Sequence, residues 1–62
     1  MMTFNEAVEI CKDFGGGRLL EGLEFIRELL IAERDEEAVI EITLEERMAY
    51  NIVVTKMRPL FV

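Results

Sequence analysis

The fold is decided by the stretch from Arg18 to Arg34, RLLEGLEFIRELLIAER. Its apolar residues recur at steps of three and four, which is the spacing of one face of an α-helix. They form two neighbouring stripes, one of Leu19, Leu23, Ile26 and Leu30 and the other of Gly22, Phe25, Leu29 and Ala32. Together the stripes cover about half of the helix circumference, which is more than one neighbouring helix needs. We therefore expect residues 18–34 to form the central helix of a small, self-associating helical domain.

An earlier helix is predicted over residues 4–14. Thr3 and Glu6 have the spacing of a capping box, in which each side chain bonds the backbone of the other residue. Apolar residues then follow at helical spacing until three glycines, residues 15–17, which disfavour a helix. Gly22 lies inside the next helix, and its cost there predicts the close approach of another backbone.

A third helix is predicted to begin near Leu44, because Thr43 and Glu46 repeat the capping-box spacing. Its apolar residues lie almost all the way round, which indicates burial from several directions. Pro59 is expected to end it, since proline cannot continue the hydrogen-bond ladder. The apolar residues 60–62 should then pack on the domain or on a partner.

The region between the last two helices is ambiguous. Residues 38–42 are short and rich in β-branched side chains, which favours an extended connector. Residues 52–55 are also rich in β-branched side chains, so an α+β alternative pairs 38–43 with 50–57 as an antiparallel hairpin. We favour the helix because its first two turns are strongly helical and capped. The predicted fold is all-α, with three helices.

At 62 residues the chain is predicted to be one helical domain, residues 1–62. A domain of this size is marginally stable alone and usually adds disulfides, a metal or a partner chain. Cys11 is the single cysteine and there is no histidine, so neither an internal disulfide nor a structural zinc site is expected. Self-association, as a homodimer or a higher oligomer, is the remaining source of stability.

The net charge of −6 is unevenly distributed. Thirteen acidic and four basic residues precede residue 47, a net of −9, whereas three basic residues and no acid follow, a net of +3. An acidic body repels phosphate, so direct nucleic-acid binding is not expected. We expect neither a secretion signal nor a membrane span, because the N-terminal residues lack a basic region followed by a long apolar one and no apolar run is long enough to cross a bilayer. A single free thiol favours the cytoplasm.

Catalytic signatures are missing from the sequence. With neither histidine nor serine, the chain cannot assemble a hydrolase triad, and Cys11 falls on an apolar helix face where it is expected to be a core residue. The turn from Gly15 to Arg18 has donors for a phosphate but not the spacing of a phosphate-binding loop, so we expect an interhelix turn. The acidic residues lack metal-ligand spacing. No enzymatic activity, cofactor or metal is expected.

Two surfaces remain as candidate sites. The first is an apolar self-association surface made of Leu19, Gly22, Leu23, Phe25, Ile26, Leu29, Leu30, Val53, Met57, Leu60 and Phe61. The second is an acidic face that would bind a partner, made of Glu21, Glu24, Glu28, Asp35, Glu36 and Glu37.

These features predict a small acidic protein that self-associates and binds an unidentified protein in order to inhibit or modulate it. Accessory inhibitors of phages and mobile elements offer an analogy of size and charge, and no motif supports it. Two alternatives stay open. The chain could be a purely structural oligomerisation module, or an acidic mimic of nucleic acid that occupies a basic groove.

Overall fold

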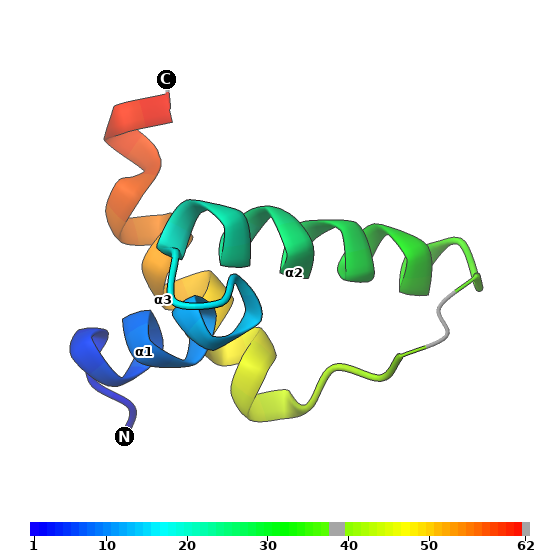
Figure 1. Cartoon of the computed structure of the whole chain (residues 1–62), viewed down its shortest axis with the longest axis horizontal. Coiled ribbons are helices and arrows are strands. Elements are labelled where there is room, and N and C mark those ends of the chain that lie inside the picture. The colour runs from blue at the N-terminus through cyan, green and yellow to red at the C-terminus, as the bar shows by residue number, and fades with distance from the viewer. Residues whose placement is uncertain (38–39, 62) are drawn as a thin grey trace.

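The computed structural model contains three helices joined by two turns or loops (Figure 1). They are α1 (Phe4–Phe14), α2 (Leu19–Arg34) and α3 (Leu44–Phe61). The structure describes the backbone of residues 1–37 and 40–61 and the side chains of residues 1–37 and 40–58. Over these ranges there is no strand, so the predicted all-α class with three helices is confirmed.

Two capping boxes set the beginnings of α1 and α3, as the sequence predicts. The Glu6 backbone N–H donates to the Thr3 hydroxyl at 3.1 Å, and the Thr3 N–H donates to the Glu6 carboxylate at 3.0 Å. Thr43 and Glu46 repeat both bonds at 3.1 and 2.9 Å. Each box satisfies backbone donors that the first turn of a helix leaves unpaired.

The glycine run ends α1 as predicted, and it does so through left-handed backbone. Gly16 has φ +62° and Gly17 has φ +95°, conformations that side chains disfavour. The Gly17 N–H donates back to the Lys12 carbonyl at 2.9 Å, which closes the last turn of the helix. The short turn then brings α2 back against α1.

α1, and not α2, is the central helix. It packs against both other helices, whereas α2 and α3 make little direct contact with each other. Ala7 and Cys11 are fully buried on α1, and small side chains allow two helices to approach it closely. The prediction that residues 18–34 form the central helix is therefore wrong. The width of its apolar stripes comes from burial on one side and open surface on another.

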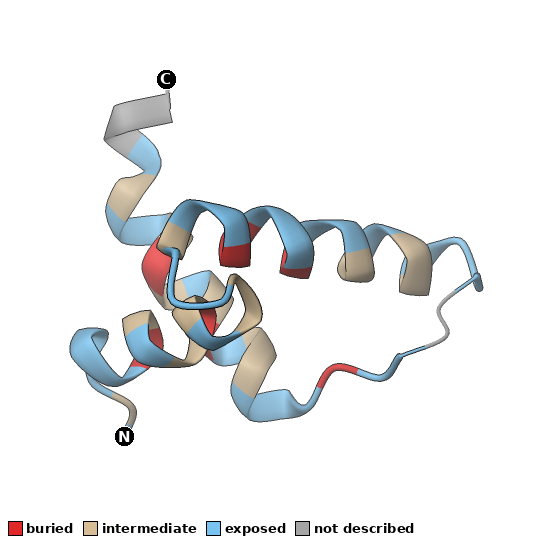
Figure 2. Ribbon diagram, viewed as in Figure 1, coloured by how far each residue is buried: buried red, intermediate tan, exposed pale blue. Residues whose placement is uncertain are grey.

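The core contains residues from all three helices and from the loop before α3. Its buried members are Ala7, Cys11, Leu23, Ile26, Ile42, Ala49 and Val53. Figure 2 shows that burial in α2 is confined to the first half of the helix, on the side facing α1 and α3. The second half extends beyond the core and carries half-buried and exposed residues.

The hairpin alternative is wrong, because residues 50–57 lie within α3. Val53 is buried against α1, so tertiary packing outweighs the strand preference of the β-branched run. Of the connector predicted over 38–42, residues 38–39 lie outside the described part, and 40–42 are irregular with Ile42 buried.

The prediction that Pro59 ends the last helix is also wrong. α3 continues to Phe61, because a proline this close to the end removes only one late hydrogen bond.

Candidate functional site

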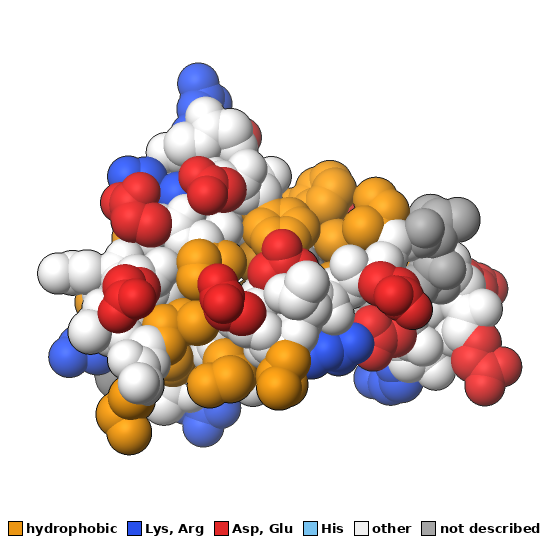
Figure 3. Space-filling view, turned by 90° about the horizontal axis from the view of Figure 1, so that it is seen from below, with side chains coloured by type: hydrophobic (Ala, Val, Ile, Leu, Met, Phe, Trp, Pro, Cys, Tyr) orange, Lys and Arg blue, Asp and Glu red, His pale blue; other side chains and the backbone are white. Residues whose placement is uncertain are grey.

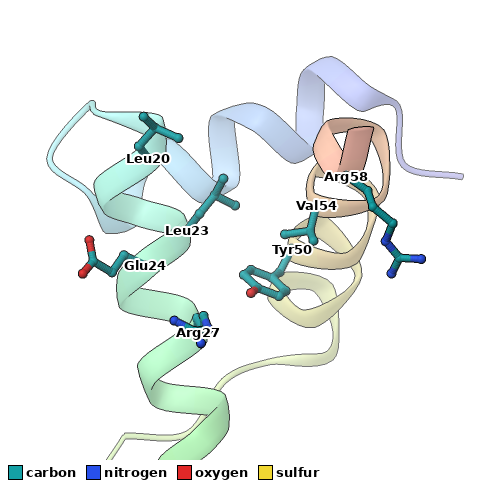
Figure 4. A pocket seen from close by; sticks show the side chains of 7 residues that line it. All are labelled: Leu20, Leu23, Glu24, Arg27, Tyr50, Val54 and Arg58. Carbon is teal, nitrogen blue, oxygen red and sulfur yellow. The ribbon is translucent and has the colours of Figure 1, made fainter. Parts of the chain in front are cut away.

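A groove with a volume of about 580 Å³ lies between α2 and α3 (Figure 4). It exists because both helices pack on α1 but hardly on each other. Seven residues line it, namely Leu20, Leu23, Glu24 and Arg27 from α2 and Tyr50, Val54 and Arg58 from α3. An apolar groove with a charged rim is the form of surface that binds an amphipathic helix.

The floor of the groove is apolar. Leu23 and Tyr50 point toward each other across the gap, while Glu24 points away from α3 (Figure 4). Leu20 is 62% exposed, although it is a large aliphatic side chain on the same helix as the core residue Leu23. Leu20 is therefore an exposed apolar side chain at the rim of the groove.

One ion pair connects the two walls beyond the groove. The Arg47 guanidinium of α3 donates to the Glu33 carboxylate of α2, and both side chains are partly exposed. This bond joins the overhanging half of α2 to the beginning of α3. It is therefore a direct side-chain contact between two helices that otherwise pack mainly on α1.

The residues predicted for self-association divide into three groups. Gly22, Leu23, Ile26 and Val53 are buried in the core of the single chain, so they are occupied within the monomer. Leu19, Leu29, Leu30 and Met57 are half-buried, and Phe25 is exposed with its ring 5.9 Å from that of Phe14. The side chains of Leu60 and Phe61 lie outside the described residues.

The close backbone contact predicted at Gly22 is present, but it is made within the chain. A Cβ placed on Gly22 would overlap the Cys11 carbonyl oxygen of α1 and lie 2.9 Å from its carbon. The same Cβ would lie 3.2 Å from the Gly15 nitrogen. Gly22 therefore serves the crossing of α1 and α2 and is closed to a second molecule.

All six residues of the predicted acidic face are exposed: Glu21, Glu24, Glu28, Asp35, Glu36 and Glu37. Glu21 pairs with Arg18 at 3.0 Å, and Asp35 pairs with Arg34 at 3.6 Å. Binding of a partner by these six residues stays a prediction.

The face of the molecule seen from below is mixed in character. Figure 3 shows acidic side chains interspersed with hydrophobic ones there.

Two exposed aliphatic residues of α2, Leu20 and Ile31, were missed by the sequence prediction. On the helix surface Leu20 adjoins Glu24, and Ile31 adjoins Arg27 and Glu28, so both lie outside the two apolar stripes. The signal that would have found them is the spacing of residues 20, 24, 27 and 31, which are neighbours along one helix face. That face has two charged residues between two apolar ones, so a search for continuous apolar stripes does not detect it.

Three backbone N–H donors of the turn from Gly15 to Arg18 are satisfied within the chain. The N–H groups of Gly15 and Gly17 donate to the Lys12 carbonyl, and that of Arg18 donates to Gly15. The Arg18 guanidinium is paired with Glu21. The turn therefore acts as a helix connector, and these donors are not directed at an anion.

The free thiol and the carboxylates are the remaining candidates for a reactive or metal-binding group. Cys11 is fully buried, and burial raises the pKa of its thiol, which disfavours the nucleophilic thiolate. Within the described residues, no cluster of acidic and cysteine side chains has the geometry of a metal site. No described helix combines the length and apolar character needed to cross a bilayer.

Comparison with protein-family models, with curated proteins and with solved structures finds no match to this chain.

Proposed function

We propose that the chain is a small non-enzymatic interaction protein, which self-associates and binds another protein in order to inhibit or modulate it. The observation that carries this proposal is the amount of apolar side chain left on its surface. Among the described residues, eight large hydrophobic side chains are exposed: Met1, Phe4, Leu20, Phe25, Ile31, Ile40, Leu44 and Met48. One of them, Leu20, lines the groove, and exposed apolar surface favours protein association.

The outer side of α2 supports a second binding surface. Glu21 and Glu28 are exposed there and lie on the side of the helix turned away from the core residues Leu23 and Ile26. A partner with a basic surface would meet these carboxylates first, because complementary charge steers association. The free thiol of Cys11 fits a reducing cytoplasm as the place of action.

Affinity purification from the cells that encode the protein, followed by direct binding measurements, tests the proposal. The variant Glu21→Lys/Glu28→Lys reverses two charges on the outer side of α2. A matched control, Asp13→Lys/Glu41→Lys, makes the same change in charge at exposed residues of α1 and the loop before α3. We expect the first variant to weaken binding to the captured partner at least about tenfold and the control to leave it unchanged.

Three outcomes would contradict the proposal in different ways. Equal affinity of both double variants would remove the acidic face from the binding site. Recovery of the chain alone would favour a purely structural oligomerisation module. Competition for the partner by duplex DNA would show instead that the carboxylates imitate nucleic acid in a basic groove.

A further inference from the structure

We propose that one stripe of α2, consisting of Leu20, Glu24, Arg27 and Ile31, is a self-complementary surface that pairs in antiparallel orientation with the same stripe of a second copy. This inference rests on the self-association part of the proposed function. It assigns that association to residues outside the apolar set predicted from the sequence, and one of the four, Glu24, belongs to the predicted acidic face.

The four side chains form a continuous row on the helix. At about 100° per residue, their positions fall within about 60° of arc. All four are exposed, with Leu20 at 62% and Ile31 at 38%. The row runs along most of α2, so a helix laid on it would make contacts over several turns.

The order of the residues makes the stripe complementary to itself when it is reversed. In an antiparallel pair with the two-fold axis midway between Glu24 and Arg27, Leu20 faces Ile31 of the second copy at both ends. Glu24 faces Arg27 of the second copy, again twice. A parallel pair would instead place Glu24 on Glu24 and Arg27 on Arg27. The charges therefore select the antiparallel arrangement, which is the isologous contact of a two-fold dimer.

The central charges are available for such pairing. Within the described residues the basic side chains that form ion pairs are Lys12, Arg18, Arg34 and Arg47. Arg27 forms none there, and neither does Glu24, although both lie beside an apolar groove. A second copy would give each of them an opposite charge.

The stripe also borders the groove. Leu20, Glu24 and Arg27 form part of its α2 wall, and Tyr50 and Val54 form the apolar wall on α3 (Figure 4). A second α2 lying along the stripe would cover the mouth of the groove. The two copies would then bring α2 and α3 of each chain together, as in a four-helix arrangement.

Sedimentation equilibrium from low micromolar to millimolar protein tests the stripe. The wild type should approach twice 7.2 kDa. Glu24→Arg and Arg27→Glu each turn two attractive contacts into repulsive ones, so each should raise the dissociation constant at least about tenfold. The double variant Glu24→Arg/Arg27→Glu exchanges the charges within one chain and should restore dimerisation to within about threefold. Asp13→Arg, on the exposed side of α1, is the matched control and should leave the mass unchanged.

Leu20→Asp provides a second test, because this exposed residue contributes little to the monomer fold. It should give a folded monomer by circular dichroism at concentrations where the wild type is dimeric. A register test uses Leu20→Cys/Ile31→Cys, in which oxidation should link two chains efficiently, whereas Leu20→Cys alone should link poorly.

Several results would overturn the inference. A wild-type monomer at millimolar concentration removes self-association altogether, and with it that half of the proposed function. If the single charge reversals leave the dissociation constant of the dimer unchanged, or if the double exchange does not restore it, another surface mediates the association. Binding of a foreign amphipathic helix in the groove, without any dimer, assigns the groove to a partner instead. Partner binding through Glu21 and Glu28 is measured separately, so its failure is distinguishable from all of these.

Discussion

Gly22 of α2 lies directly against the Cys11 carbonyl of α1, with no room for a side chain between the two backbones. Gly15, at the end of α1, is closed from the other direction, since a Cβ there would meet the backbone of Arg18 and Gly22. The two glycines and the buried Cys11 together form a crossing in which the two backbones meet without an intervening side chain. The position of α2, and so the shape of the groove, depends on this contact.

Gly22→Ala should destabilise the domain by about 3 kcal/mol or more, because the added methyl group overlaps backbone that cannot move independently. Helix propensity alone gives the opposite sign, since alanine is preferred over glycine in a helix by about 1 kcal/mol. Chemical denaturation followed by circular dichroism distinguishes the two. Gly16→Ala is the control, because nothing lies within 4 Å of its Cβ position and only the backbone strain at φ +62° remains. A Gly22→Ala variant as stable as the wild type would contradict the close crossing.

The end of α2 contains a residue in an unfavourable conformation. Glu36 has φ +60°, and the bonds from the Glu36 N–H to Glu33 and from the Glu37 N–H to Ala32 form the double closure typical of a helix that ends on glycine. Glu36→Gly should therefore stabilise the domain by about 1 kcal/mol, which raises the midpoint of thermal unfolding by about 4–8 °C in a domain of this size. Asp35→Gly is the control, because its φ of −88° is ordinary and glycine there brings no relief. Melting curves should be compared at one protein concentration.

The capping box of α1 should make the stability of the fold vary with pH in the acidic range. The backbone hydrogen bond from Thr3, followed by the bond from its hydroxyl, lowers the pKa of Glu6 below the ordinary value of 4.5. A carboxyl group with a lowered pKa in the folded state stabilises the fold above the pKa of the unfolded chain. That contribution is lost as the pH falls below 4.5 and through the folded pKa.

Glu6→Gln tests this assignment, because glutamine keeps the capping bond and does not titrate. The free energy of unfolding should fall less steeply with decreasing pH in this variant than in the wild type. Parallel pH curves for the two proteins would show that other carboxyl groups cause the acid sensitivity.

Cys11 should be unreactive in the folded protein. The thiol is fully buried, and burial raises its pKa above the ordinary value of 9.0, so the thiolate is scarce at neutral pH. A thiol reagent should label the native chain only as fast as the domain opens, and should label it rapidly in denaturant. Because Cys11 is the single cysteine, the reading is unambiguous. Rapid native labelling would contradict the buried position between the helices.

The sequence predicts the local features of this fold well, because they depend on a few neighbouring residues. The boxes at Thr3 and Thr43 fix where two helices begin, and the glycine run fixes where α1 ends. The sequence does not identify the central helix. The width of an apolar stripe does not reveal what covers it, and the small residues Ala7 and Cys11 that make α1 central resemble minor members of a stripe.

The candidate site was only partly predictable for a related reason. The apolar residues of α2 were expected at an interface, and the structure places Leu23 and Ile26 in the core of a single chain. The surface left over combines Leu20 and Ile31 with charged residues, and its meaning depends on the place of α3 beside it. That relationship is tertiary, so no periodicity within one helix reports it.

The ion pair between Glu33 and Arg47 should connect α2 and α3 measurably although it is partly exposed. In a double-mutant cycle with Glu33→Gln and Arg47→Gln, we expect a coupling of about 0.5 kcal/mol, because water screens a pair of this exposure. The coupling should shrink in high salt, since screening shortens the range of the attraction. The same cycle made with Glu45 in place of Glu33 should give no coupling, because Glu45 is exposed at the beginning of α3 and is in no ion pair among the described residues. Zero coupling for the Glu33 cycle at low salt would mean that α1 alone holds the two helices in place.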